Sequence, residues 1–420
     1  MSQPYRALSD GSLPEVLAAM PQVREQLGGA FTQWSVQEVG DGNLNLVFIV
    51  KGPGGSVIVK QALPYVRLVG DSWPLPLARS YYEHMALTEQ TKHVPKLVPK
   101  IYHYDRDLAL IVMEYLTPHI IMRKGLIQGI EYPLFASHIA EFMAQTLFKT
   151  SVLAISAAEH KRRIWAFIDN IALCKITEDL VFTDPYRVAK LNRWTEPFLD
   201  DIAAEFREDE QLKLAVQKRK LQFLTSAEAM IHGDLHTGSI MVTPLDTRVI
   251  DPEFAFVGPM GFDVGAVIGN LLIAYFAQAG HEERPGARTP YRHWILVQAE
   301  QVWRQFNKRF LELWDASKSG EAYMPELFTD PQGAVAFAAE KQRFMRSLFA
   351  DTVSFAGIKM IRRVLGLAHT EDLESIKDPA VRASCERKVL NLARRLILDA
   401  DKLTGIGDVT IAARGVLAAQ

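Results

Sequence analysis

One stretch near the middle of the chain, residues 231–253, constrains the fold more than any other. It reads IHGDLHTGSIMV, then a short polar turn, then RVIDPE. Apolar segments on both sides of a turn predict a hairpin. The hairpin would gather three carboxylates, Asp234, Asp251 and Glu253, in one place. The chain is therefore expected to fold around an acidic group that suits a hard cation.

The spacing of the three acids suggests different tasks for them. Asp234 follows the apolar run 229–231, in a turn where a carboxylate can accept the proton of a substrate hydroxyl. Strand alternation predicts that Asp251 and Glu253 share one face, with Pro252 between them. Mg²⁺ prefers one or two carboxylates together with phosphate and water oxygens, so this pair could hold Mg²⁺ against a nucleotide. The alternative is two solvated acids at a strand end.

The motif resembles that of protein kinases, with two departures. Where those enzymes have an Asn five residues after the catalytic Asp, this chain has Ser239, a weaker metal ligand. Asp251-Pro252-Glu253 replaces Asp-Phe-Gly, and Glu253 is expected to supply the lost ligand. The residues from His232 to Ser239, followed by those from Asp251 to Ala255, resemble the 5-methylthioribose kinases, a family within the choline kinase and aminoglycoside phosphotransferase group. Length and motif order match along essentially the whole chain.

This resemblance implies an α+β, two-lobed protein-kinase-like fold. Residues 1–115 would form a small antiparallel-sheet nucleotide-binding lobe, and residues 116–420 a larger, mostly helical lobe with the catalytic and substrate sites. The implied reaction transfers the γ-phosphate of ATP to the 1-hydroxyl of 5-methylthioribose in methionine salvage, with Mg²⁺ as cofactor. Asp234 would be the catalytic base, and Asp251, Glu253 and Ser239 the metal ligands. The rival hypotheses are the same fold acting on choline, homoserine or an aminoglycoside, and a non-catalytic nucleotide-binding module.

Composition agrees with a two-lobed metabolic enzyme. The 420 residues include 47 Lys and Arg against 49 Asp and Glu, and 48% are hydrophobic, enough for two cores. Without a basic run, neither nucleic acid nor a membrane surface is an expected partner. The resemblance implies ATP and a small sugar as partners, and a homodimer is left open. Cys174 and Cys385 have no metal or redox spacing, which favours a reducing compartment. The N-terminus lacks an apolar signal core, so a cytoplasmic location is expected.

One apolar segment could be mistaken for a membrane span. Residues 264–280 carry no charge, and their length lies near the lower limit of ~17 residues for a spanning helix. Asn270, Gln278 and the glycines favour a helix buried within the large lobe instead. Asp263, directly before it, is expected to be the N-cap, and the resemblance implies that it also braces the catalytic loop.

The first third of the chain predicts a short helix followed by strands. Ser12-Leu-Pro-Glu15 has the form of a capping box, which favours a helix over residues 13–27. Glycine-rich links then separate three runs rich in Val, Ile and Phe, which predicts an antiparallel meander. The expected strands are residues 32–39, 44–51 and 55–61.

Two features of this sheet are typical of a nucleotide site. The link containing Gly40, Gly42 and Asn43 could bring backbone N–H groups close to phosphate oxygens, although a type I′ turn explains it equally well. Lys60 ends the third strand where kinases pair the α- and β-phosphates, and Glu83, in a helix expected over 77–90, is its candidate partner. The alternative makes Lys60 a solvated strand end and Glu83 a partner of Arg79.

The hinge between the lobes is expected near residue 115. Residues 101–104 and 108–113 flank Asp105-Arg106-Asp107, which predicts a further hairpin. Its second strand runs into Glu114, Tyr115 and Leu116, whose main chain could bind the edge of a nucleotide base, which the resemblance implies is adenine. Otherwise these three residues simply lead out of the sheet.

Helical periodicity dominates after residue 119. A polar, Gly- and Pro-rich segment at 280–290 predicts an exposed loop, and the last eleven residues either pack on the large lobe or fray. The expected helical segments are 133–157, 160–174, 194–224, 291–315, 355–368 and 385–403.

Substrate recognition is assigned to two places. Arg362 and Arg363 lie in a largely apolar helical run, and the resemblance makes them candidates for binding the sugar hydroxyls or the transferred phosphoryl group, with Asp234 as a further substrate contact. The alternative is an ion pair with a carboxylate such as Asp351. Trp73, between polar residues and prolines, either packs into the core or closes over the methylthio group.

Overall fold

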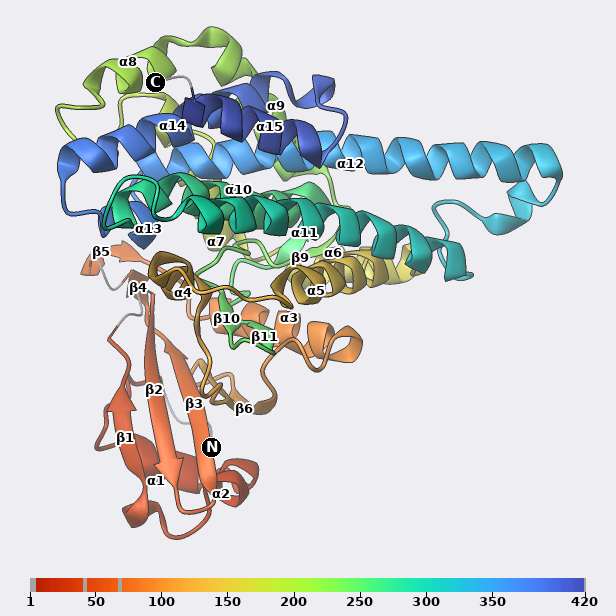
Figure 1. The fold of residues 1–420 in the computed structure, drawn as a ribbon. Helices are drawn as coiled ribbons and strands as arrows, with labels where there is room; N and C mark the ends of the chain where they lie inside the picture. The colour runs from red at the N-terminus through yellow and green to blue at the C-terminus, as the bar shows by residue number, and fades with distance from the viewer. Residues whose placement is uncertain (1–4, 41–43, 67–69, 419–420) are drawn as a thin grey trace. The chain divides into compact units, whose positions relative to one another are not determined.

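The computed structural model describes residues 5–40, 44–66 and 70–418 and divides the chain into two compact units. Unit 1 comprises residues 1–119, 170–173 and 248–255. Unit 2 comprises residues 120–169, 174–247 and 256–420. Figure 1 shows strands gathered in the first and helices in the second, as the α+β prediction requires.

Unit 1 is built on an antiparallel sheet with the strand order β1-β2-β3-β7-β6. The predicted meander is therefore confirmed. The elements are α1 (Leu13–Ala18), α2 (Pro21–Leu27), β1 (Ser35–Glu38), β2 (Asn45–Gly52), β3 (Gly55–Ala62), β4 (Tyr65–Val66), β5 (Gly70–Pro74), α3 (Arg79–His93), β6 (Ile101–Asp105) and β7 (Leu110–Glu114).

Alternation along β3 explains how the sheet separates its core from its charged group. Val57 and Val59 are fully buried in a cluster with Leu17 of α1 and Leu27 of α2. Lys60, the next residue along, points to the opposite face of the pleated strand, the face that α3 covers. One strand thus serves a hydrophobic core with one face and a polar site with the other.

Three local predictions for this region are wrong. The expected helix over 13–27 breaks into α1 and α2, because Pro21 lacks an N–H and its predecessor Met20 is extended, with φ −98° and ψ 106°. No capping box forms at Ser12, whose hydroxyl instead accepts a hydrogen bond from the N–H of Ser9 at 2.9 Å. The strand expected from residue 32 begins only at Ser35, since residues 31–33 form a 3-10 turn.

Unit 2 is mainly helical, and the loop that carries Asp234 lies between strands of two small sheets: β10 belongs to a three-stranded sheet of order β11-β10-β8, and β9 pairs with β12. Its helices are α4 (Met122–Gln128), α5 (Phe135–Lys149), α6 (Ala157–Phe167), α7 (Ile171–Leu180), α8 (Asp200–Glu208), α9 (Glu210–Thr225), α10 (Met260–His281), α11 (Thr289–Ala316), α12 (Pro331–Leu365), α13 (Glu371–Glu374), α14 (Pro379–Leu398) and α15 (Ile406–Ala418). The strands are β8 (Ile120–Ile121), β9 (Ala229–Ile231), β10 (Ile240–Val242), β11 (Thr247–Val249) and β12 (Phe256–Gly258); the last two residues of β11 belong to unit 1.

The apolar segment expected to be a buried helix is α10, and that prediction is confirmed. The helix is long and apolar enough to span a membrane, yet its most hydrophobic window is completely buried by the rest of the protein. The prediction of Asp263 as N-cap is wrong: α10 begins at Met260, so Asp263 lies within its first turn. Its carboxylate is therefore free to accept hydrogen bonds from another segment.

Glycines let α10 and α12 approach closely. A Cβ on Gly265 would lie 2.5 Å from the carbonyl oxygen of Thr352, and one on Gly269 would lie 2.8 Å from that of Ala356. Both distances are impossible for a real side chain, so only glycine permits this contact. This close packing determines the positions of the α12 side chains relative to α10.

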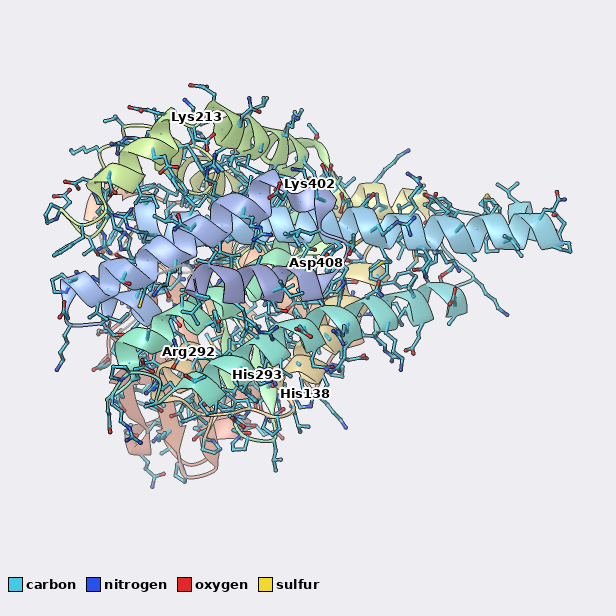
Figure 2. The ribbon with its side chains drawn as sticks, turned by 45° about the horizontal axis from the view of Figure 1, so that its top comes forward. His138, Lys213, Arg292, His293, Lys402 and Asp408 are labelled. Carbon is cyan, nitrogen blue, oxygen red and sulfur yellow. The ribbon has the colours of Figure 1, made fainter. Side chains whose placement is uncertain are left out.

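The remaining predicted helical segments are helical in the structure, but several have other boundaries than predicted. Residues 160–174 and 194–224 each hold two helices, α6 with α7 and α8 with α9; Asp209 caps the last of these. The run at 355–368 is the end of α12, whose first half extends beyond α10 and α14 in Figure 1. At the chain's end, α15 packs against α11 and α14 (Figure 2), with Val409 and Ala413 fully buried.

Candidate functional site

Unit 1 contains a compact acidic group formed by Glu83, Asp251 and Glu253. One carboxylate oxygen from each lies within 4.8 Å of the others. Glu83 projects from α3, and the other two lie in the segment that follows β11. The N–H of Val249 donates to the carbonyl of Leu97 at 2.7 Å, which ties this segment into unit 1.

The acidic pair does not arise from strand alternation, so that part of the prediction is wrong. β11 ends at Val249, and Asp251 adopts a left-handed backbone conformation with φ 69°. The amide of Asn170 holds this irregular turn by donating to the carbonyls of Glu253 and Ala255, both at 3.0 Å. A non-glycine residue in this region is uncommon and costs energy, which marks the turn as a site where geometry matters more than stability.

Lys60 meets the predicted partner. Its ammonium lies 2.8 Å from a carboxylate oxygen of Glu83 and forms a second ion pair with Asp251, while only 11% of its side chain is exposed. The alternative of a solvated strand end is therefore wrong. Arg79, the other proposed partner of Glu83, instead lies 3.5 Å from Glu253 and donates to the carbonyl of Leu63 at 2.6 Å.

The charges of this group are unevenly balanced. Burial alone would lower the pKa of Lys60, but Asp251 and Glu83 outweigh it and raise the pKa, so the lysine stays charged. Burial raises the pKa of Glu83 to about 8, and burial also raises that of Glu253; Asp251 adds to both shifts. Three carboxylates face two cations, and oxygen donors that crowd together in this way fit a divalent cation.

The sequence assigned other nucleotide contacts to unit 1. Gly40 lies in a turn after β1, whereas Gly42 and Asn43 lie outside the described residues. Glu114 ends β7, where its carboxylate accepts from the N–H of Lys100 at 3.1 Å and lies 3.4 Å from Arg248. Leu116 is buried, and the ring of Tyr115 lies under the ammonium of Lys51. Main-chain binding of adenine by residues 114–116 stays a prediction.

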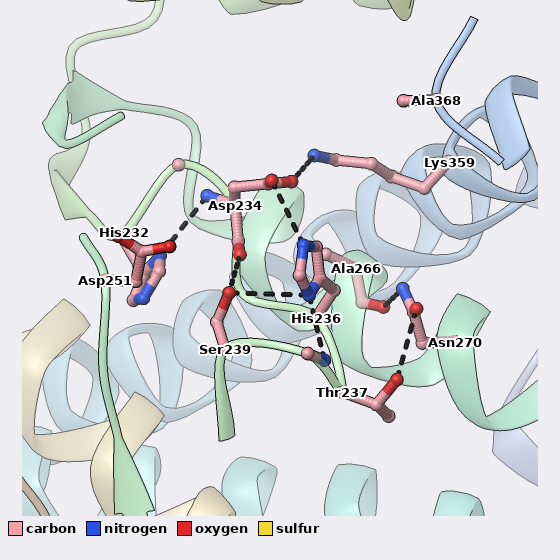
Figure 3. Close-up of polar contacts among 12 residues, drawn as sticks. His232, Asp234, His236, Thr237, Ser239, Asp251, Ala266, Asn270, Lys359 and Ala368 are labelled. Atoms are coloured by element: carbon pink, nitrogen blue, oxygen red, sulfur yellow. Dashed lines mark hydrogen bonds and ion pairs between the residues drawn. The ribbon is translucent and has the colours of Figure 1, made fainter. Parts of the chain in front are cut away.

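Unit 2 holds Asp234 in the loop between β9 and β10 (Figure 3). Asp263 of α10 accepts from the N–H groups of His232 at 2.6 Å and Gly233 at 3.0 Å, so the predicted brace is confirmed. The hydroxyl of Ser239 donates to the carbonyl of Asp234 at 3.0 Å and closes the loop from the other side. Ser239 thus has a structural bond, and its proposed role as a metal ligand stays a prediction.

The carboxylate of Asp234 is surrounded by donors (Figure 3). Lys359 lies 3.1 Å and Arg362 lies 3.7 Å from Oδ1, and Nε2 of His236 lies 3.3 Å from Oδ2. Because Nδ1 of His236 accepts from the N–H of Gly238 at 2.9 Å, the ring proton belongs on Nε2, directed at Asp234. Burial would raise the pKa of Asp234, but Lys359 and His236 outweigh it and hold the pKa well below its usual value.

Arg362 and Arg363 contact different groups. Both are buried, but Arg362 points to Asp234, whereas Arg363 donates to the carbonyl of Ala368 at 3.2 Å. The alternative partner, Asp351, pairs with Arg219 instead, so it does not neutralise either arginine. Burial and Arg362 lower the pKa of Arg363.

Trp73 was predicted to contact the substrate, whereas Lys359 was not predicted to belong to the site. Trp73 is half-buried in β5, and neither of its proposed roles is tested by this position. Lys359 was missed by the sequence argument. The signal was present, since a lysine three residues before Arg362 in an apolar helix requires a buried partner.

Comparison with known proteins places this geometry in a family. Residues 35–306 match the model of the phosphotransferase enzyme family. Methylthioribose kinase 1 from Oryza sativa subsp. japonica is 49% identical over 97% of this chain and 95% of its own length. Methylthioribose kinase from Escherichia coli O45:K1 is 43% identical over 98% of both chains. A choline/ethanolamine kinase family protein from Mesorhizobium loti, known as a crystal structure, is 14% identical with a TM-score of 0.42, covering 96% of this chain and 99% of its own.

Proposed function

We propose that this chain, which belongs to the phosphotransferase enzyme family and within it to the methylthioribose kinases, transfers the γ-phosphoryl group of ATP to the 1-hydroxyl of 5-methylthioribose. The 1-phosphate and ADP are the products. The reaction belongs to methionine salvage, and its proposed location is the cytoplasm. A homodimer is the proposed assembly.

The groups of unit 1 are suited to the nucleotide. We assign Lys60 to the ATP phosphates, because it is a charged lysine held in place by Glu83. Asp251 and Glu253 would hold Mg²⁺, with Ser239 proposed as a weaker ligand, and Mg²⁺ would neutralise charge on the phosphates when bound. Gly40, Gly42, Asn43 and the main chain of residues 114–116 are the other proposed ATP contacts.

Asp234 is suited to the acceptor. Its low pKa keeps it ionised at neutral pH, so it is a weak base but a constant acceptor. It would accept a hydrogen bond from the 1-hydroxyl, direct that oxygen at the γ-phosphorus, and take the proton late, as the new O–P bond forms and the bond to the β-phosphate oxygen breaks. A carboxylate has about four acceptor positions. Lys359 of α12 and His236 of the loop occupy only some of them.

The observation that carries this proposal is the excess of cations around Asp234. Arg362 and Arg363, together with Lys359, suit a neutral sugar that becomes anionic on phosphorylation, and Trp73 is a candidate contact for the methylthio group. Choline or an aminoglycoside is cationic and would be repelled here. A non-catalytic module would have no use for a catalytic aspartate braced on both sides.

The test is a coupled assay of ADP release with ATP, Mg²⁺ and a panel of acceptors: methylthioribose, choline, homoserine and kanamycin. We expect release with methylthioribose at least about 100-fold above that with the others, judged by kcat/KM. A preference for any other acceptor, or no acceptor-dependent release, would reject the proposal.

A further inference from the structure

Lys359 is a buried cation in an apolar helix. It lies in α12 between fully buried neighbours, Ile358 and Met360, and only 3% of its side chain is exposed. Lysine is almost never buried to this extent unless a partner compensates the loss of hydration. The residue that compensates this loss therefore indicates the role of Lys359.

Within the described part of the chain, the ammonium of Lys359 contacts two residues, both outside its own helix. It donates to Oδ1 of Asp234 at 3.1 Å, and it lies 4.1 Å from the ring centroid of Phe262 in α10. The second distance is well within the range of a cation–π contact. The ring also limits where the ammonium can move. Figure 3 shows the hydrogen bond from Lys359 to Asp234.

The close packing of α10 against α12 makes this reach possible. Gly261, Gly265 and Gly269 recur every four residues on α10, and a Cβ on any of them would lie within 2.9 Å of an atom of α12. The helix that braces the catalytic loop through Asp263 is therefore the helix that positions Lys359. A lysine elsewhere on α12 would not share this support.

We propose that Lys359 is a positioning residue for phosphoryl transfer: it fixes Oδ1 of the Asp234 carboxylate, so that the remaining acceptor positions are aimed at the substrate hydroxyl. The proposal rests on the function proposed above. It gives the two ends of the carboxylate separate partners, with Lys359 on Oδ1 and His236 on Oδ2. Fixing both ends removes rotation of the carboxylate, which is the kind of preorganisation that favours the transition state.

The surroundings of Lys359 give the role a pH signature. It interacts with Asp234 of the loop, Asp263 of α10, and Arg362 and Arg363 of its own helix, while His236 lies on the other oxygen of Asp234. Burial lowers the pKa of Lys359 to about 8, and the arginines act in the same direction. Burial also lowers the pKa of His236, to about 3, so the imidazole stays neutral. The ammonium therefore loses its proton as the pH rises through the range just above neutrality.

The first experiment compares K359M and K359R in the full-length protein. We expect K359M to lose about 100-fold or more in kcat, with the KM for ATP changed by about twofold or less, because one aimed donor to a reacting group has an effect of this size. K359R keeps the charge at all accessible pH values. It should recover part of kcat, and the decline of its kcat at alkaline pH should move to higher pH than in the wild type.

Lys341 offers a matched control. It lies on the same helix, pairs with Asp315 at 2.6 Å and lies over the ring of Phe337 at 4.3 Å. It thus repeats both contacts of Lys359 without contacting Asp234. We expect K341M to keep the kcat of the wild type, and thermal unfolding of all variants shows whether folding is retained.

A double-mutant cycle keeps the proposal testable even if K359M is less stable. Lys359 acts through Asp234, so D234N/K359M should turn over no more slowly than D234N alone. If the losses in kcat of D234N and K359M multiply in the double mutant, the proposal is overturned. It is also overturned if the kcat of K359M stays within about threefold of the wild type, or if the kcat of K359R declines at the same alkaline pH as that of the wild type. A wild type without sugar-dependent ADP release would instead reject the proposed function, and this proposal with it.

Discussion

Asp234 shows how the surroundings of one residue determine its chemistry. A carboxylate alone in a buried loop would bind a proton and lose its charge. Lys359, His236 and Arg362 reverse that preference, so the group stays ionised well below neutral pH. An ionised carboxylate of low basicity suits a reaction in which the proton leaves the hydroxyl late.

The first prediction concerns this carboxylate. D234A should bind ATP with near-normal affinity while kcat falls by roughly 1000-fold, since the acceptor loses its orienting group and proton acceptor. Calorimetric titration of the nucleotide and the coupled assay measure the two quantities. Retained turnover would remove Asp234 from catalysis.

The second prediction concerns Glu253. E253Q keeps the size of the side chain but removes its charge, so the Mg²⁺ concentration that gives half-maximal rate should rise by about tenfold or more. E89Q, on the same helix as Glu83 but paired with Lys92 at the surface, is the control and should titrate like the wild type. An unchanged Mg²⁺ titration of E253Q would return Glu253 to a purely structural role.

At the scale of elements, the contact between α10 and α12 supports the loop that carries Asp234. α10 braces the loop through Asp263, and α12 supplies Lys359 and Arg362. Neither helix is amphipathic at this contact, since nearly all residues there are buried. The separation of the helices therefore depends on the size of the side chains between them.

The third prediction tests this separation. G265A places a Cβ 2.5 Å from the carbonyl oxygen of Thr352, so we expect a loss of about 1–3 kcal/mol in the free energy of unfolding, together with a lower kcat. G415A in α15 has open space around it and is the control. Because alanine is favoured over glycine in a helix interior, G415A should be neutral or stabilising. Equal stability of the two variants in chemical denaturation would contradict the packing argument.

Elements were predictable from the sequence where local signals decide them. Glycine-rich links and β-branched runs located β2 and β3, and the order of a glycine turn, Lys60 and Glu83 located the ion pair. Predictions failed where one residue overrides a pattern. Pro21 divides the first helix, and the left-handed conformation of Asp251 replaces the expected strand.

At the scale of the whole molecule, some contacts could not be predicted because they join distant parts of the chain. The bond from Lys359 to Asp234 spans 125 residues and depends on helix packing that no local pattern encodes. The turn at Glu253 depends likewise on Asn170, which no motif had indicated. The types of chemical group at the site could be predicted from the sequence. The residues that each group contacts are determined by tertiary packing and could not be predicted.

The fourth prediction concerns global stability and pH. Burial raises the pKa of Glu228 to about 7, above its ordinary value of 4.5, although it accepts from the N–H of Met260 at 2.9 Å. A raised carboxyl pKa means that the folded state binds the proton more tightly, so stability is full below pH 4.5 and declines as the pH rises to about 7. In E228Q this decline should be smaller, as measured by thermal unfolding at several pH values. If stability depends on pH identically in E228Q and the wild type, the prediction is wrong. The control is E326Q, since Glu326 is exposed, and its stability should depend on pH as that of the wild type does.

The central claim is that one active site joins an ATP γ-phosphoryl group to the 1-hydroxyl of methylthioribose under the control of Asp234. The most direct test is a single turnover of wild-type protein with ATP, Mg²⁺ and ¹³C-labelled methylthioribose, followed by ³¹P and ¹³C NMR of the product. The account predicts phosphorus coupled to carbon 1 of the sugar and an equal amount of ADP. Phosphate on another hydroxyl, or ATP hydrolysed to free phosphate with the sugar unchanged, would contradict it.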